Sequence, residues 1–356
     1  MASRGWRTWG CSVSREVSGI SRALKLGLIG FGYWGPNLFR NLIETEGADV
    51  VSCADKRPDR RALAQRRYPA LKVTDDASAV IDDPEIDAVV IATPVSTHYE
   101  LARRALGQGK HVLVEKPMTR SVAEGEELIE LAEKNGLVLM VDHTFIYTGA
   151  VRRMKELIDR GELGDLYYFD SVRVNLGIFQ HDVDVVWDLA PHDLSILTHL
   201  IQAAPTHVSA IGADHVGIGH SDIAYITVFF ASSFIAHFHV NWLSPVKVRQ
   251  ILIGGDRKMM VYDDMEQSEK VRVYDSGIKV TTADDIYATL VDYRTGDMWA
   301  PKLDFGEALG FECAHFVDCV RYKTIPLSNG QAGLTVVRVL EAASRSLAAN
   351  GERIAL

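Results

Sequence analysis

The sequence of 356 residues lacks the features that mark a membrane protein or a general nucleic-acid binder. It holds no run of about 18 apolar residues, the length that a membrane-spanning helix requires. Aspartate and glutamate (47) outnumber lysine and arginine (38), and the formal net charge of -9 would repel a phosphate backbone. We therefore expect small-molecule partners, and neither a membrane nor a nucleic acid.

Cysteine is scarce, with only Cys11, Cys53, Cys313 and Cys319 in the chain. No two of them form a Cys-x-x-Cys pair, and their spacing matches no zinc site. We expect no metal site, and reduced thiols in a cytoplasmic protein.

The first 22 residues are rich in arginine and lack the apolar stretch of a secretory signal. Their composition resembles a transit peptide, but a tail left by an upstream start codon would look the same. We expect residues 1–23 to form a disordered tail or a presequence, and the fold to begin at Leu24.

Residues 24–144 alternate short apolar runs with helical segments. The apolar runs are residues 24–29, 50–54, 88–92, 111–114 and 137–141. They are continuously apolar, as strands buried on both faces of a parallel sheet would be. Strand–helix alternation of this kind predicts an α/β domain, a doubly wound Rossmann sheet.

Residues 145–356 show a different pattern. A helix is expected at residues 150–159, a strand at 166–175 and a helix at 185–201, followed by a series of strands after Pro205. Two more helices are expected near residues 309–321 and 330–349, and they could pack back on the first domain. We predict an α+β substrate and oligomerisation domain with a largely antiparallel open sheet.

A dinucleotide-binding motif follows the first predicted strand and opens a helix: Gly30-Phe31-Gly32-Tyr33-Trp34-Gly35. The three glycines allow a tight turn, a close approach to pyrophosphate and close helix–strand packing. Asp55 ends the second strand, where a carboxylate binds ribose hydroxyls and repels a 2′-phosphate, which favours NAD. Lys56 and Arg57 leave NADP open, because either could hold that phosphate.

Further candidate cofactor-binding residues lie where later strands end, at the edge of the sheet where ligands bind. Thr93 and Pro94 end one strand, and His98 begins the next helix. Glu115 and Lys116 end another strand just before a proline. The ammonium of Lys116 could stabilise a developing alkoxide, although a lone lysine at a turn is more often a solvated charge.

The second domain supplies Asp188 and His192, four residues apart and therefore on one helix face. An imidazole titrates near neutrality and suits removal of a hydroxyl proton, while Asp188 could orient it. Pro191 complicates a regular helix and could instead lie in the first turn of a helix that begins there. An ordinary surface Asp–His pair is the alternative, and no further ligands accompany the pair as a metal site would require.

The glycine motif, Glu115-Lys116-Pro117 and Asp188-x-x-x-His192 occur in this order, and together they resemble the glucose–fructose oxidoreductase/inositol dehydrogenase/MocA (Gfo/Idh/MocA) family. The resemblance runs from Leu24 to the C-terminus. It implies an NAD(P)-dependent dehydrogenase acting on a sugar CH–OH group, with catalytic Lys116 and His192 assisted by Asp188. It also implies a homodimer or homotetramer formed through the C-terminal sheet.

Within that family, the glycine motif and residues 187–193 look most similar to UDP-N-acetylglucosaminuronate 3-dehydrogenases. This implies oxidation at C3 of a nucleotide-linked sugar. Arg173 could then pair with a uronate or phosphate and Asn175 with a hydroxyl or amide, unless both belong to an ordinary polar strand face.

Several other activities fit the same residues. They are an NADP-dependent deoxysugar-nucleotide 3-ketoreductase, an inositol or sugar dehydrogenase, an NAD-dependent glycosidase, and a non-catalytic nucleotide-sensing regulator. The presence of both Lys116 and His192 argues against the regulator.

Overall fold

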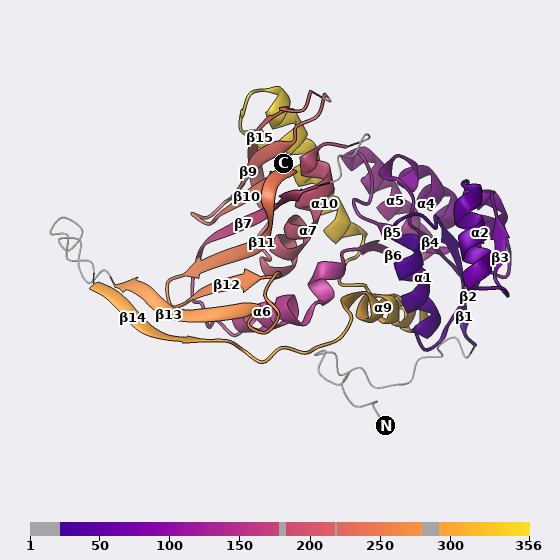
Figure 1. The fold of residues 1–356 in the computed structure, drawn as a ribbon, viewed down its shortest axis with the longest axis horizontal. Helices are drawn as coiled ribbons and strands as arrows, with labels where there is room; N and C mark the ends of the chain where they lie inside the picture. The colour runs from indigo at the N-terminus through magenta and orange to yellow at the C-terminus, as the bar shows by residue number, and fades with distance from the viewer. Residues whose placement is uncertain (1–21, 178–182, 218, 280–291) are drawn as a thin grey trace.

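The computed structural model describes residues 22–177, 183–217, 219–279 and 292–356. Residues 1–21 of the predicted tail therefore lie outside the described residues. The chain forms two sheets, one in each half, with helices between and around them (Figure 1).

The first sheet has six parallel strands in the order β3-β2-β1-β4-β5-β6. They are β1 (Leu24–Ile29), β2 (Ala48–Ala54), β3 (Lys72–Thr74), β4 (Ala88–Ile91), β5 (His111–Glu115) and β6 (Leu139–Asp142). All four residues of β4 are buried, because helices cover both faces of the sheet. The strand order reverses between β1 and β4, the point at which such sheets bind ligands.

Helices from both ends of the chain cover this sheet. The local elements are α1 (Gly35–Glu44), α2 (Pro58–Arg67), α3 (Ala77–Ile81), η1 (Val95–Thr97), α4 (His98–Gly107), α5 (Val122–Asn135) and η2 (Thr144–Tyr147). Apolar residues of α1 share one core with those of α9 (Ala308–Tyr322). On the other face, α3, α4 and α5 share a core with the first half of α10 (Gly330–Ala348). The last two long helices therefore pack against the first sheet.

The second sheet has nine strands in the order β14-β13-β12-β11-β7-β10-β9-β8-β15. They are β7 (Leu166–Leu176), β8 (Pro205–Ala213), β9 (Ile223–Phe230), β10 (Ile235–Asn241), β11 (Leu243–Gly255), β12 (Met259–Asp263), β13 (Val271–Lys279), β14 (Asp292–Trp299) and β15 (Ile354–Ala355). β10 and β7 run parallel, and the other neighbouring pairs are antiparallel. The predicted fold class, a doubly wound sheet followed by a largely antiparallel one, is confirmed.

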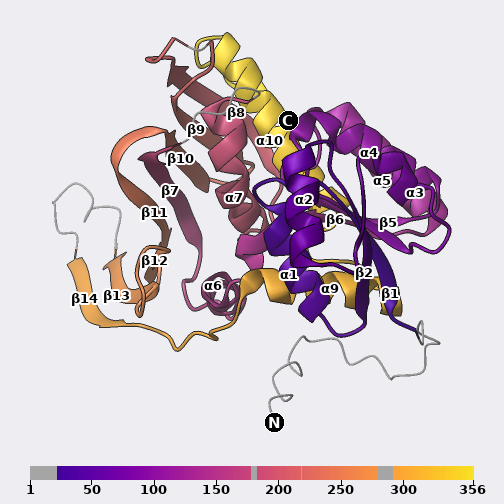
Figure 2. The same ribbon diagram turned by 45° about the vertical axis from the view of Figure 1, so that its right-hand side comes forward.

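One face of the second sheet is covered by α6 (Gly149–Asp159), α7 (Val185–Leu200) and α10, which share its core. Figures 1 and 2 show α7 and α10 lying between the two sheets. On the opposite face, the side chains of Ile211, Tyr225 and Ile235 are exposed. No helix among the described residues has both the length and the apolarity to cross a membrane.

Helix α7 begins earlier than the position of Pro191 suggests. The Asp184 carboxylate accepts a hydrogen bond of 2.9 Å from the Trp187 N–H and caps the helix, which then runs through Pro191 to Leu200. The alternative that Pro191 lies in a first turn is therefore wrong. A proline inside a helix leaves the carbonyl four residues earlier, that of Trp187, without its usual donor.

Candidate active site

The glycine motif forms a turn between β1 and α1 that has the shape a pyrophosphate needs. Gly30 has φ +99°, and a Cβ there would lie 2.4 Å from the Ala92 carbonyl oxygen. A Cβ on Gly35 would lie 2.1 Å from the Gly30 carbonyl oxygen, whereas one on Gly32 would meet nothing within 4 Å. No side chain caps the N-terminus of α1. The turn is thus closed on the protein side and open at Gly32, and it fits a dinucleotide.

The side chains within this turn point to different surroundings. Phe31 is fully buried and makes an edge-to-face contact with Phe39 at 6.0 Å, so only its backbone can face a ligand. Tyr33 is 90% exposed. Trp34 donates from Nε1 to Asp142 Oδ2 at 2.8 Å, which ties the turn to the end of β6.

Asp55 is fixed beside the turn. Its carboxylate accepts hydrogen bonds from the N–H of Phe31 at 2.6 Å and from the N–H of Arg57 at 2.8 Å. The Arg57 guanidinium pairs with Asp59 at 2.8 Å, while Lys56 is exposed. Of the two cations that could have held a 2′-phosphate, Arg57 thus already has a carboxylate partner, and the carboxylate of Asp55 beside the turn suits NAD.

His98 is buried behind the sheet edge. Its Nδ1 lies 2.9 Å from the Pro117 carbonyl oxygen and its Nε2 lies 2.8 Å from the Thr93 carbonyl oxygen. Burial lowers its pKa, so the ring is neutral at pH 7 and donates to one of the two carbonyls at a time. The side chain joins the two loops that carry Thr93-Pro94 and Lys116, and its predicted cofactor contact stays a prediction.

A cleft of about 310 Å³ opens between the two halves of the chain. The first half lines it with the glycine turn, Thr93, Pro94 and residues 115–117. The second half lines it with Trp187 and Asp188 from α7. The cleft therefore lies at the carboxyl edge of the first sheet, where the sequence places the catalytic groups.

Lys116 spans this cleft. Its Nζ donates to the main-chain carbonyl of Asp188 at 3.0 Å and lies 3.9 Å from Asp188 Oδ1. The other carboxylate oxygen of Asp188 accepts from Trp242 Nε1 at 3.0 Å. The indole of Trp242, the residue that follows β10, thereby fixes the carboxylate that faces the ammonium.

His192 lies one helical turn beyond Asp188 on the same face of α7. Its ring is half-buried and meets the ring of Phe145 edge-on at 5.2 Å. Burial lowers the pKa of His192 well below the ordinary 6.5, and the positive charges of Lys116, Arg173 and Arg249 lower it further. A neutral imidazole at pH 7 can accept a proton, as a general base must.

Buried carboxyl groups lie beneath Lys116. Glu115 accepts from the N–H of Lys116 at 2.9 Å, and burial together with the neighbouring Asp142 raises its pKa well above 4.5. Glu312 of α9 is fully buried, and burial and Asp142 raise its pKa in the same way. Burial and the neighbouring Asp142 therefore favour the protonated form of both carboxyl groups.

Arg173 does not present a free guanidinium. Its Nε and one terminal nitrogen donate to the two oxygens of Asp193 at 2.8 and 2.6 Å, and both side chains are almost fully buried. Asn175 lies two residues further along β7, so it faces the same side of the sheet as Arg173. Substrate roles for Arg173 and Asn175 remain predictions.

Sequence reasoning did not identify Asp142, Phe145, Trp242, Arg249 and Glu312 as site residues. Asp142 directly follows a predicted strand (residues 137–141), and that position was a readable signal. Trp242 and Arg249 reach the site through the pairing of β11 and β10 with β7, which the sequence does not reveal. Within the described residues, no group of three or more His, Cys, Asp or Glu side chains could hold a metal ion.

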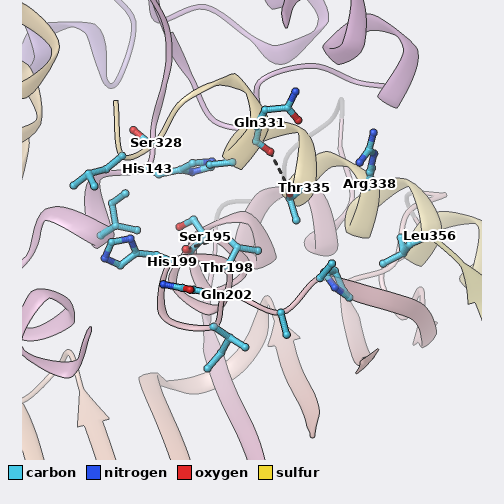
Figure 3. A pocket seen from close by; sticks show the side chains of 17 residues that line it. His143, Ser195, Thr198, His199, Gln202, Ser328, Gln331, Thr335, Arg338 and Leu356 are labelled. Carbon is cyan, nitrogen blue, oxygen red and sulfur yellow. Dashed lines mark hydrogen bonds between the residues drawn. The ribbon is translucent and has the colours of Figure 1, made fainter. Parts of the chain in front are cut away.

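A second cavity, of about 450 Å³, lies between the C-terminal half of α7 and the first turns of α10 (Figure 3). Ser195, His199 and Gln331 line it, and none of the predicted site residues does. His143 lies at its edge, buried, with no hydrogen-bond partner among the described residues for either ring nitrogen. Burial lowers the pKa of His143 to about 4.

Two family models match the chain. The model described as an oxidoreductase family with an NAD-binding Rossmann fold covers residues 24–143, and the GFO/IDH/MocA C-terminal domain covers residues 151–261. The scyllo-inositol 2-dehydrogenase (NAD(+)) of Bacillus subtilis (strain 168) is 26% identical over 321 residues, which are 86% of this chain and 89% of the relative.

Solved structures share the same fold over nearly the whole chain. UDP-N-acetylglucosamine 3-dehydrogenase GnnA from Acidithiobacillus ferrooxidans has a TM-score of 0.78 at 22% identity and covers 92% of this chain and 98% of its own. Levoglucosan dehydrogenase in complex with NADH has a TM-score of 0.79 at 20% identity, with coverages of 94% and 99%. At these identities the likeness shows the fold alone.

Proposed function

This chain belongs to the Gfo/Idh/MocA family of NAD-dependent sugar and polyol oxidoreductases, and we propose that it oxidises the C3 hydroxyl of a nucleotide-linked sugar. The observation that carries the proposal is that Lys116 from the first half meets Asp188 of α7 across one cleft, with His192 one helical turn beyond Asp188 on the same helix. The reaction removes a proton from the hydroxyl oxygen and a hydride from its carbon, and leaves a ketone.

Each residue has one task in this mechanism. NAD, when bound along the glycine turn, supplies the hydride acceptor. His192 accepts the hydroxyl proton, because its ring is neutral at pH 7. Lys116 donates a hydrogen bond to the same oxygen and stabilises its developing negative charge. Asp188 holds the ammonium from the far side of the cleft.

The nucleotide and the C3 position are supported by resemblance. The motifs at Gly30–Gly35 and residues 187–193 resemble those of uronate 3-dehydrogenases, and GnnA, which shares the fold, is described as a UDP-N-acetylglucosamine 3-dehydrogenase. We also propose a homodimer or homotetramer built through the uncovered face of the second sheet, and a cytoplasmic setting. The exposed Ile211, Tyr225 and Ile235 on that face support the interface.

A substrate screen tests this proposal. Purified protein with NAD is incubated with UDP-sugars, dTDP-sugars, free sugars and scyllo-inositol, and NADH is followed by its absorbance. We expect turnover with a nucleotide sugar, and NMR of the product should show a ketone at C3. Turnover of inositol alone would contradict the nucleotide-sugar proposal and favour a polyol dehydrogenase, which the Bacillus subtilis relative supports.

A further inference from the structure

Arg249 and His192, the proposed proton acceptor, both contact the ring of Phe145. On the sheet it is the direct cross-strand partner of Arg173, so both side chains face α7. Its guanidinium carbon is 5.9 Å from the centre of the Phe145 ring, and Phe145 meets the His192 ring at 5.2 Å. The charge of Arg249 also lowers the pKa of His192, which agrees with a short separation.

Arg249 is the least neutralised cation around His192. Lys116 contacts both the main-chain carbonyl and the carboxylate of Asp188, and Arg173 forms two hydrogen bonds with the carboxylate of Asp193. Among the described residues, the only ion pair of Arg249 is one hydrogen bond of 3.3 Å, from one terminal nitrogen to Asp264.

Its partner Asp264 is also shared. The Asp264 carboxylate accepts from Lys270 Nζ at 3.1 Å and from the Tyr262 hydroxyl at 3.1 Å. One carboxylate therefore faces two cations, Arg249 and Lys270. The Arg249 side chain remains 30% exposed, and its Nε has no hydrogen-bond partner among the described residues.

We propose that Arg249 binds an anionic oxygen group of the substrate, so that the site is selective for anionic sugars over neutral ones. The inference rests on the function proposed for Lys116 and His192. A planar guanidinium with free N–H groups pairs with either a carboxylate or a phosphate. The group is thus a uronate carboxylate on the sugar ring or a phosphate of the nucleotide. The negative charge of the bound group would also offset the effect that the positive charge of Arg249 has on the pKa of His192.

Binding measurements test this without requiring turnover. Protein loaded with NADH is titrated calorimetrically with glucose, glucuronate, UDP-glucose and UDP-glucuronate. The variants are Arg249→Gln, Arg249→Lys and Arg338→Gln. Arg338 serves as the matched control, because it pairs with Glu126 on the exposed side of α10, away from the cleft.

We expect the unaltered protein to bind at least one anionic ligand about 10- to 100-fold more tightly than its neutral counterpart, as a charge-assisted hydrogen bond would give. Arg249→Gln should abolish that preference, Arg249→Lys should keep part of it, and Arg338→Gln should keep all of it. If Arg249→Gln loses affinity for glucuronate, the group that Arg249 binds is a carboxylate. If the variant loses affinity for both UDP ligands, the group is a phosphate.

Two results would overturn the proposal: no preference for anions in the unaltered protein, or an unchanged preference in Arg249→Gln. Asp264→Asn provides a second variant if Arg249→Gln does not fold. It leaves Arg249 in place and removes the competing carboxylate, so the anion preference should rise, and a fall would count against the proposal. If the preference holds but none of the nucleotide sugars yields NADH, the proposed function fails and the anion site stands.

Discussion

The buried pair of Arg173 and Asp193 makes a prediction that separates a structural role from a substrate role. Both side chains are almost fully buried, with two hydrogen bonds of 2.8 and 2.6 Å between them. Asp193→Asn leaves the guanidinium buried without a counter-charge. Removing one partner of a buried pair costs about 3–5 kcal/mol, and we expect a loss of that size in the free energy of unfolding.

The assay is urea denaturation at pH 7, monitored by tryptophan fluorescence. It compares the free energy of unfolding of Asp193→Asn with that of the double variant Arg173→Met/Asp193→Leu. The double variant removes both charges and fills the same space, so it should lose less than about 1 kcal/mol. If the pair has a structural role alone, the double variant should also keep turnover within about threefold.

Two results would refute this reasoning. A cost below about 1 kcal/mol for Asp193→Asn would mean that the pair is exposed to water and worth little. A double variant that is stable but has lost activity on an anionic sugar would mean that Arg173 binds substrate, as the sequence suggested.

Three further variants test other parts of the site. Gly32→Ala should fold normally, because its Cβ meets nothing within 4 Å, yet weaken NAD binding about tenfold or more, whereas Gly30→Ala, at φ +99°, should also destabilise the fold by about 1–3 kcal/mol in thermal melts. Equal effects of the two substitutions would contradict this account of the turn. Glu312 has a raised pKa in the folded state, so folding takes up a proton and stability falls as pH rises above 4.5. Glu312→Gln should therefore gain stability over the unaltered protein by up to about 1.4 kcal/mol per pH unit above 4.5, and a difference that does not vary with pH would refute the buried neutral carboxyl. Trp242→Phe removes the donor to Asp188 and should lower kcat several-fold without changing the Kd for NAD; a weaker NAD affinity with normal kcat would contradict that role.

Much of the first half can be read from the sequence, since its signals are local. Residues such as 88–92 are apolar throughout because both faces of β4 are buried. The glycine turn is equally readable, because Gly30 and Gly35 leave no space for a side chain. The position of Lys116 follows from the same logic, since it ends a strand at the ligand edge of the sheet.

The second half hides more, since its site depends on pairing between distant strands. The sequence placed Arg173 and Asn175 on a strand near His192 but could not show that Asp193 already engages Arg173. The sequence also could not predict that Arg249 lies beside Arg173, because the register between β11 and β7 depends on how distant parts of the chain pack together. The predicted start of α7 at residue 185 is confirmed, and the capping bond of Asp184 explains why the helix begins before Pro191.

The central claim is that Lys116 and His192 act on one alcohol carbon. Its most direct test is the rate of NADH formation by Lys116→Ala and His192→Ala on the sugar identified by the screen, with Lys134→Ala and His207→Ala as controls outside the cleft. Removing the group that accepts the proton, or the one that stabilises the developing negative charge, should lower kcat by about 100-fold or more in each site variant, with unaltered melting temperature and unaltered NAD binding. Site variants that turn over as fast as the controls would contradict the account.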